Sequence, residues 1–555
     1  MCGIYGYIGD KDAYSVVLNG LSLLQYRGYD SCGVAYYNNG FKVNKAVGTL
    51  NNLKECTIKP KMAFGHTRWA TNGVVSEANA HPHVSFNGEI TVVHNGIIKN
   101  SDEIKGKLIE KGINFYSETD TEVIANYLTT IDINKNIDSI FKDLKGTYSL
   151  IIGNSAGDIT LIKQFSPLHI LKADNEIYIS SDISSLPSGE LYSLKDGDII
   201  KIVNKEIVGS KDIKFKQHIT NKEQLNLGLY SHYMLKEINE TPEAIRDTYF
   251  NIKDIDFKAI LNAYSEITLL GCGTAYNSCL IGESFIQNKL NIKASTYLAS
   301  NYHINKNIDK NHLHIIVSQS GETADCIKVA ENIRSFNGKI LVITNEPTST
   351  MVNLADYLIL TKAKKEIAVA STKTYCCQVF TFAYMCEKFL NADYNLNINS
   401  LVAGISTFIK NVNIKPIANR LKDIKHLIMI GKETDYLTLL EASLKIREID
   451  YIYTLPMFAS ELKHGTLSLI EKGSVVLTLN SNKDKTDLSS TINEICSREG
   501  EVININEYCD NFNVNEFYKP ILTVIPFQLL SYEIAILNGR NPDMPRNLAK
   551  SVTVE

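Results

Sequence analysis

The sequence lacks the features that mark membrane, secreted and metal-binding proteins. No apolar run reaches the roughly 18 residues of a membrane span, and the first residues lack the basic and apolar regions of a secretory signal. The 11 cysteines form no C-x-x-C pair and no Cys/His cluster at zinc spacing, so we expect reduced thiols in a cytoplasmic protein. Basic and acidic residues number 57 and 61, which argues against a protein that follows a nucleic-acid backbone.

The composition is that of an ordinary globular protein, with 44% hydrophobic and 21% charged residues. A length of 555 residues predicts three or four domains. Up to about residue 215, short apolar runs separated by Gly, Asn and Asp predict strands, among them 90–98, 147–153 and 176–180. Helical patterns are expected at 12–26, 102–111 and 120–130. We therefore predict an α+β domain of layered sheets with helices outside.

A different pattern begins near residue 255, where an apolar strand, a Gly-containing loop and a helix follow one another. It occurs at 267–286 and 313–334, with a further strand at 339–346, and it returns at 426–449 and 474–495. This repetition predicts two α/β domains with parallel sheets. The expected organisation is an N-terminal domain at 2–215, a linker at 216–254, an α/β domain at 255–396, a linker at 397–419, a second α/β domain at 420–546 and a C-terminal tail at 547–555.

Cys2 is a candidate nucleophile, because a small second residue generally permits removal of Met1. The freed α-amino group, with a reference pKa of about 7.7–8.0, can then serve as the base for the cysteine's own thiol. For Cys2 taken alone, an accident of sequence is the simpler interpretation.

Five motifs in one order change that interpretation: MCGIYGYIG (1–9), YRGYDSCG (26–33), GHTRWAT (65–71), HNGII (94–98) and SETDTEV (117–123). Together they resemble the class II glutamine amidotransferase domain over about residues 2–215. The resemblance implies the N-terminal nucleophile fold, with α/β/β/α layers, and hydrolysis of glutamine at Cys2.

Each further residue of these motifs has a role and a simpler alternative. Arg68 can clamp the α-carboxylate of glutamine in a planar fork, or form an ordinary surface ion pair. Asp120 can hold the α-ammonium group, or cap a helix, or do both. Asn95 and Gly96 can donate hydrogen bonds to an oxyanion, or form a type I′ hairpin turn. The resemblance places Trp69, the single tryptophan, at the mouth of an ammonia channel; alternatively, it is a core residue.

The loop 318–323, with sequence SQSGET, lies between a predicted strand and a helix. Its hydroxyl and N–H groups can bind a phosphate monoester, although an ordinary capped loop is equally consistent. It has neither the Walker nor the Rossmann pattern. With GCGT (271–274) and VASTK (369–373) it resembles the sugar isomerase (SIS) domain, and 420–546 resembles a second copy. This resemblance implies binding of a sugar phosphate by Thr274, Ser318, Gln319, Ser320, Thr323 and Ser371.

Glu441, Lys445 and Glu448 are spaced to lie on one face of a helix. Salt bridges are the simpler interpretation. In the functional one, Glu448 removes a proton from C1 of a sugar imine, a role that a pKa raised by burial would suit, and Lys445 orients it. His464 resembles the family residue that opens the sugar ring. Lys550 in the terminal motif would form a Schiff base with a sugar ketone, although a lysine near a chain end is ordinarily solvated.

One amidotransferase domain followed by two SIS domains and the tail PRNLAKSVTVE resembles the glutamine-dependent aminotransferases of amino-sugar synthesis. The resemblance implies L-glutamine and fructose 6-phosphate as substrates and glucosamine 6-phosphate and glutamate as products, in the first step towards UDP-N-acetylglucosamine. It also implies a homodimer that needs no metal or other cofactor, no nucleic acid and no membrane. One alternative, a phosphoribosyl-pyrophosphate amidotransferase, predicts a phosphoribosyl-binding domain in place of the SIS copies. Another, a sugar-phosphate sensor, predicts loss of Cys2, Glu448 or Lys550.

Overall fold

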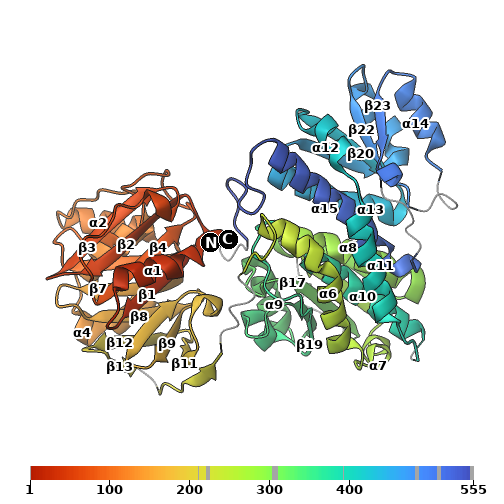
Figure 1. Ribbon diagram of the computed structural model, residues 1–555. Coiled ribbons are helices and arrows are strands. Elements are labelled where there is room, and N and C mark those ends of the chain that lie inside the picture. Colours follow the sequence, from red (N-terminus) through yellow and green to blue (C-terminus); the bar gives the residue numbers. More distant parts are fainter. Residues whose placement is uncertain are drawn as a thin grey trace. The chain divides into compact units, whose positions relative to one another are not determined.

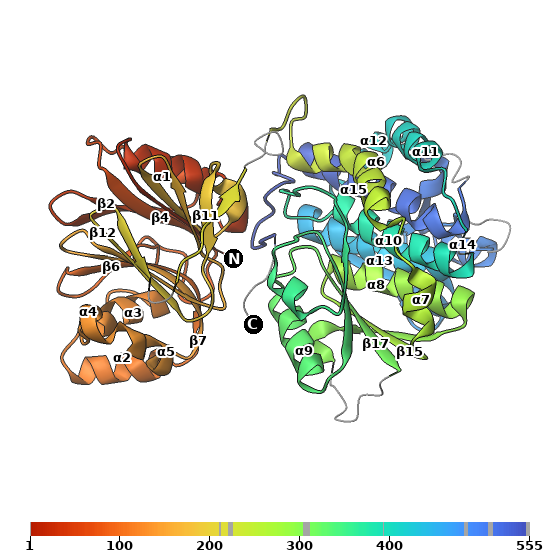
Figure 2. The ribbon, with the colours of Figure 1, turned by 90° about the horizontal axis from the view of Figure 1, so that it is seen from below.

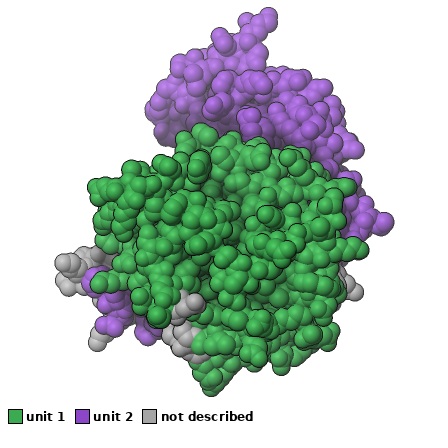
Figure 3. Space-filling model, turned by 90° about the vertical axis from the view of Figure 1, so that its left-hand side faces the viewer, with its two compact units in different colours: residues 1–223, 551–554 green, residues 224–550, 555 purple. Residues whose placement is uncertain are grey.

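The structure is a computed structural model that describes residues 2–209, 212–219, 226–302, 311–391, 393–481, 487–508 and 514–550. The chain forms two compact units that divide between residues 223 and 224 (Figure 3). The last five residues of the tail lie outside the described ranges.

Unit 1 contains two antiparallel sheets, with strand orders β14-β11-β9-β10-β1-β4-β2-β3 and β13-β12-β8-β7-β6-β5 (Figure 1). Its strands are β1 (Gly3–Ile8), β2 (Ser31–Tyr37), β3 (Phe41–Val47), β4 (Met62–Arg68), β5 (His83–Val84), β6 (Ile90–Ile98), β7 (Gly146–Asn154), β8 (Ile159–Gln164), β9 (His169–Ala173), β10 (Glu176–Ser180), β11 (Gly189–Ser193), β12 (Asp198–Val203), β13 (Glu206–Gly209) and β14 (Lys216–His218). Its helices are α1 (Ala13–Ser22), α2 (Ser101–Glu110), α3 (Asp120–Leu128), α4 (Ile133–Asn136) and α5 (Ile140–Asp143).

The alternation of side chains along each strand explains the layers of unit 1. Successive strand residues point to opposite faces. Ile4 and Ile8 of β1 therefore lie in the core between the sheets, whereas Tyr5 and Tyr7 pack with α1 on the outer face. In the second sheet, Val93 of β6 faces the first sheet, and its neighbouring residues pack against α2 and α3. Both faces of both sheets are thus covered, which gives the expected order of helix, sheet, sheet and helix.

Unit 2 contains two parallel sheets, β16-β15-β17-β18-β19 and β21-β20-β22-β23, with helices around them (Figure 2). The first α/β part comprises α7 (Phe257–Asn262), β15 (Glu266–Gly271), α8 (Thr274–Phe285), β16 (Lys293–Leu298), β17 (His312–Ser318), α9 (Ala324–Ser335), β18 (Lys339–Thr344), β19 (Tyr357–Leu360) and α10 (Lys373–Leu390). The second comprises α12 (Lys415–Leu421), β20 (His426–Gly431), α13 (Glu433–Asp450), β21 (Tyr453–Phe458), β22 (Val475–Thr478), α14 (Ser489–Cys496), β23 (Glu501–Asn504) and α15 (Lys519–Leu537). Along the chain, helix α11 (Ile398–Asn411) comes between these two parts.

Helix α6 (Tyr233–Ile252) occupies about half of the segment 216–254, which the sequence suggested as a linker. Its buried side chains join the same core as α10 and α11. It is therefore an integral part of unit 2.

One segment, Glu516–Leu537, is long and apolar enough to cross a membrane by length and composition. In the structure, 78% of its most apolar stretch is buried, and it packs along α13 and α12. A helix that is apolar on all sides is also what the centre of a large core requires. We interpret the segment as the core helix of unit 2.

Candidate active site

In unit 1, Cys2 lies at the start of the central strand β1, beside the end of β4. Its sulfur lies 3.4 Å from the backbone nitrogen and 3.6 Å from the carbonyl oxygen of Trp69. Burial raises the pKa of the Cys2 thiol, and the positive charges of Arg68 and Arg27 act in the opposite direction. A thiol held in this way needs a nearby base to become a nucleophile.

Asn95 and Gly96 lie inside β6, where they pair with Ser149 and Tyr148 of β7. The hairpin alternative for this Asn-Gly pair is therefore wrong. The Asn95 amide donates a hydrogen bond of 3.0 Å to the carbonyl oxygen of Cys2, which places it beside the thiol residue. Gly96 has φ +133°, and a Cβ there would collide with the Thr147 carbonyl, so only glycine fits.

Arg68 and Asp120 have buried charged groups with capacity left for a ligand. Arg68 donates from Nη2 to the carbonyl oxygen of Asn72, whereas its buried Nη1 has no hydrogen-bond partner among the described residues. Asp120 is the first residue of α3; the residue that caps this helix is Thr119. The Asp120 carboxylate instead accepts the N–H of Ile98 at 2.9 Å. A buried guanidinium and carboxylate suit the carboxylate and ammonium of an amino acid.

Trp69 is half-buried, so it is not the fully buried core residue of the simpler alternative. Its backbone N–H donates a hydrogen bond to the Cys2 sulfur, and its carbonyl oxygen accepts one from the Cys2 thiol. The backbone of Trp69 is thus part of the surroundings of the nucleophile.

Four buried histidines lie in this unit. His66 stacks on His81 with 4.1 Å between ring centroids, and His81 is 5.0 Å from His83. His94 bonds Thr121 at 3.0 Å. Burial lowers the pKa of all four, that of His66 to about 3. The sequence analysis did not single out this cluster, because its members are brought together only by the fold.

Acid should destabilise unit 1 through these histidines. Each is neutral when folded but takes up a proton below pH 6.5 when unfolded, so stability falls as the pH drops below that value. Between pH 7 and 5 the loss is about 2 kcal/mol for each histidine that stays neutral. Urea unfolding followed by Trp69 fluorescence measures this in unit 1. His81→Gln should reduce the loss by that amount, and equal unfolding free energies at both pH values would contradict the interpretation.

In unit 2, the loop after β17 has the form expected of a phosphate-binding turn. The hydroxyls of Ser318 and Thr323 lie 2.8 Å apart, and Ser318 Oγ accepts the N–H of Gly321 at 3.1 Å. Gly321 has φ +62°. Glu322 anchors the loop through Thr350 N at 2.7 Å. The loop opens directly into α9, whose N-terminal dipole favours an anion. Gln319 and Ser320 lie in this loop and are partly exposed.

Helix α13 brings Glu441, Lys445 and Glu448 together as its spacing predicts. Lys445 Nζ lies 3.3 Å from Glu441 Oε1 and 2.8 Å from Glu448 Oε2. It also donates to Thr274 Oγ1 at 3.1 Å, which ties α13 to the start of α8. Glu448 keeps 22% of its side chain exposed, whereas Glu441 is fully buried, and burial raises the Glu441 pKa. The burial that we associated with Glu448 is thus found at Glu441.

The side chain of Lys550 is buried, unlike the solvated side chain that its position near the chain end suggests. Its side chain is 6% exposed and its Nζ lies 2.6 Å from Glu366 Oε2. Ser371 Oγ donates to the same oxygen at 2.8 Å, so two predicted site residues meet at one carboxylate. Glu366 was missed by the sequence analysis, although it lies in the run EIAVASTK that carries Ser371.

His464 lies on an exposed turn between two short 3₁₀ helices, Ala459–Lys463 and Thr466–Leu469. None of the hydrogen bonds or ion pairs of the described residues joins its ring to Glu448 or Lys550. Within one chain, therefore, the structure does not connect His464 with the other site residues.

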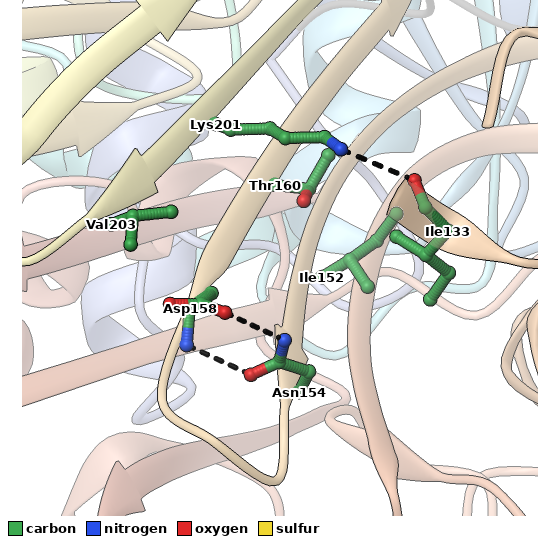
Figure 4. Close-up of a pocket in the computed structure, with 7 residues that line it drawn as sticks. All are labelled: Ile133, Ile152, Asn154, Asp158, Thr160, Lys201 and Val203. Atoms are coloured by element: carbon green, nitrogen blue, oxygen red, sulfur yellow. Dashed lines mark hydrogen bonds between the residues drawn. The ribbon is translucent and has the colours of Figure 1, made fainter. Parts of the chain in front are cut away.

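An open hollow in unit 1, lined by β7, β8 and β12, carries none of the predicted site residues (Figure 4). Its polar groups are already paired: Lys201 donates to Ile133 O at 3.3 Å, and Asn154 and Asp158 bond each other across a turn. We assign no function to it.

Comparison with known proteins matches both parts of the chain. Residues 260–387 and 420–516 match the SIS domain family, and residues 66–188 match the glutamine amidotransferase domain family. The fold class expected from the sequence is thereby confirmed. Two relatives align with this chain over 100% of its length and 100% of their own. The chain is 36% identical over 610 residues to the glutamine–fructose-6-phosphate aminotransferase (isomerizing) of Caldanaerobacter subterraneus subsp. tengcongensis. It is 36% identical over 602 residues to the protein of that name from Pyrococcus horikoshii.

Among solved structures, the C-terminal domain of glucosamine-fructose-6-phosphate aminotransferase from Francisella tularensis is similar to this chain with a TM-score of 0.51 and 29% identity. The match covers 59% of this chain and 100% of that one.

Proposed function

The chain belongs to the family of glutamine–fructose-6-phosphate aminotransferases (isomerizing), and we propose that Cys2 and Lys550 carry the two halves of its reaction. The enzyme transfers the amide nitrogen of glutamine to fructose 6-phosphate and isomerises the product to glucosamine 6-phosphate, with release of glutamate. The two SIS matches leave no place for the phosphoribosyl-binding domain of the first alternative. Because Cys2, Glu448 and Lys550 are all present, the sensor alternative is also disfavoured.

In the glutamine half, the Cys2 thiolate attacks the side-chain amide carbon of glutamine. After removal of Met1, the α-amine of Cys2 takes the thiol proton and returns it to the leaving ammonia. Asn95 and Gly96 donate to the oxyanion. Arg68, with its unpartnered Nη1, holds the α-carboxylate, and Asp120 holds the α-ammonium. We assign Trp69 to the ammonia channel on the family resemblance.

In the sugar half, the neutral amine of Lys550 adds to C2 of the open-chain ketose, and water leaves as the imine forms. The phosphate is bound by Ser318, Gln319, Ser320 and Thr323 at the start of α9, while Thr274 and Ser371 contact the sugar. After ammonia has replaced the lysine, Glu448 removes a proton from C1 and returns it to C2. Lys445 orients the Glu448 carboxylate from 2.8 Å.

One observation carries the sugar half: a lysine six residues from the chain end is buried against a carboxylate that also accepts a hydrogen bond from Ser371. Burying two charges is costly and is maintained where the pair has a function. Incubation with glutamine and fructose 6-phosphate, followed by mass detection of an amino sugar phosphate, tests the function. The absence of this product, with either glutamine or ammonia as donor, would overturn it.

We further propose a cytoplasmic homodimer. The edge strand β21 exposes apolar side chains that a second copy would cover, with Tyr453 76% and Leu455 42% exposed. His464 is also exposed, as expected if it completes the site of the neighbouring subunit. The ten described cysteines form no disulfide, which is consistent with a reducing compartment. We propose the domain ranges given by the sequence with one change: α6, within the segment 216–254, belongs to unit 2.

A mixture of two inactive variants tests the shared site. If His464 acts across the dimer, a pair formed by one His464→Ala chain and one Lys550→Ala chain has one intact site of two. Random pairing should then restore about a quarter of wild-type sugar conversion. No recovery after co-refolding into dimers would show that His464 does not act across the interface.

A further inference from the structure

Glu237 is a buried acid of α6 that the reaction outlined above does not use. Its side chain lies against the segment 365–373, and its Oε1 accepts hydrogen bonds from the N–H groups of Ile367 and, at 3.3 Å, Ala368. Its Oε2 is buried without a hydrogen-bond partner among the described residues. Burial and the nearby Glu366 carboxylate raise the pKa of Glu237 to about 8. At neutral pH, therefore, this carboxyl group carries a proton.

Glu366 is the opposite case. It is fully buried, but its carboxylate accepts from Lys550 Nζ at 2.6 Å, Ser371 Oγ at 2.8 Å, Thr372 N at 2.8 Å and Thr374 N at 3.2 Å. These donors, with Lys550 foremost, outweigh burial and hold its pKa at about 2. Two neighbouring buried acids thus have pKa values shifted in opposite directions, because Glu366 is paired with a lysine side chain and has more donors around it than Glu237.

A single hydrogen bond links Glu237 to the backbone next to Glu366. Glu237 binds the N–H of Ile367, the residue that follows Glu366, so the position of the Glu366 backbone depends on Glu237. One turn further along α6, Glu240 accepts from Lys373 Nζ at 2.7 Å, and Lys373 also donates to Lys365 O at 2.7 Å. Helix α6 therefore holds the segment 365–373 at two places, next to the residue that contacts Lys550 and at its last residue.

We propose that Glu237 is a positioning residue of the sugar site, which fixes the segment carrying Glu366 and, through Glu366, the amine of Lys550. This inference rests on the proposed Schiff-base role of Lys550. In its neutral form Glu237 accepts the two N–H groups without repelling Glu366. Once ionised, Glu237 places a second negative charge beside the Glu366 carboxylate. The repulsion between the two carboxylates then displaces the segment 365–373, which carries Glu366.

The groups facing Glu237 come from three further elements besides α6. Tyr233 on α6, Glu366 on the segment before α10, Lys373 on α10 and Lys550 of the C-terminal tail act on Glu237 directly, while Glu240 pairs with Lys373, and Lys365 and Asp543 act on Tyr233. The charges of Lys550 and Lys373 lower the pKa of Glu237, but burial and Glu366 outweigh them. Titration of Glu237 is therefore expected above neutrality.

The pH profile of Glu237→Gln tests the proposal. Glutamine keeps the accepting Oε1 but cannot ionise. Wild type and variant are compared in amino sugar phosphate formation from pH 7 to 9, because their ratio cancels every pH effect that they share. At pH 9 only about a tenth of Glu237 is neutral in the wild type, so the variant-to-wild-type ratio should rise about tenfold. Glutamine hydrolysis, measured in parallel, should show a constant ratio.

Two further variants complete the test. Glu237→Ala removes the acceptor and should lower sugar conversion at every pH while glutamine hydrolysis persists. Glu243→Gln, on the exposed part of the same helix beside Arg246, should follow the wild-type profile. A flat ratio for Glu237→Gln, or full activity of Glu237→Ala, would overturn the proposal. If the wild type makes no amino sugar phosphate at all, the proposed function fails instead.

Discussion

Replacement of Lys550 by arginine is expected to abolish sugar conversion and to leave glutamine hydrolysis measurable. Arginine keeps the positive charge that Glu366 requires at 2.6 Å, but it cannot lose its proton to become a nucleophile. The loss should be on the order of a thousandfold or more, because the covalent path is removed entirely. The measurement is amino sugar phosphate formed per chain, with glutamate release followed in the same sample.

Lys550→Ala should show the same chemical loss but also destabilise unit 2, since it leaves the Glu366 carboxylate buried and unpaired. Comparison of the two variants therefore separates chemistry from folding. Lys472→Ala, which removes a solvent-exposed lysine of the same unit, is the matched control. Borohydride reduction with fructose 6-phosphate should attach the sugar to the peptide that contains Lys550. Trapping on another lysine, or normal conversion by the arginine variant, would refute the Schiff-base role.

Replacement of Cys2 by alanine should reduce glutamine-dependent product by about a thousandfold or more, because the proposed nucleophile is removed. Product formation from added ammonia should persist, since the sugar half needs only a nitrogen nucleophile. The experiment compares amino sugar phosphate from glutamine with that from ammonium at one pH.

Cys56→Ala is the matched control for the glutamine half. The Cys56 thiol is also partly exposed, but it donates only to the carbonyl oxygen of Ile58 at 3.4 Å. It should retain both activities. Loss of ammonia-dependent product in Cys2→Ala to the same extent as glutamine-dependent product would mean that the thiol is not confined to the glutamine half. A mature chain that retains Met1 and still hydrolyses glutamine would exclude the α-amine as base.

The sequence was sufficient to predict a structural feature where that feature depends only on residues close together in the chain. The runs at 90–98, 147–153 and 176–180 became β6, β7 and β10, because short apolar runs suit strands whose two faces are both covered. The spacing of Glu441, Lys445 and Glu448 placed all three on one face of α13, since helix geometry alone decides it.

Predictions from the sequence were wrong where the same short pattern occurs in two different local structures. Asn-Gly is a strong hairpin signal, yet residues 95 and 96 pair along the middle of β6, because the long apolar run continues on both sides. Asp120 was a candidate to cap α3, but Thr119 takes that position, and Asp120 is the first residue of the helix. The segment 216–254 reads as polar, but the apolar stripe of α6 is buried against α10 and α11.

The sequence by itself determined the order of the domains and the family, and it singled out Cys2 and Lys550 as candidates, because motifs of adjacent residues can be recognised without knowledge of distant contacts. Only the tertiary structure decided that Glu366 faces Lys550 across 184 positions of the chain and that Glu237 holds its neighbour across 130. It also decided that the pKa of Glu237 is raised and that of Glu366 is lowered. Burial and the number of donors around a carboxyl group set its pKa, and both are properties of the assembled fold.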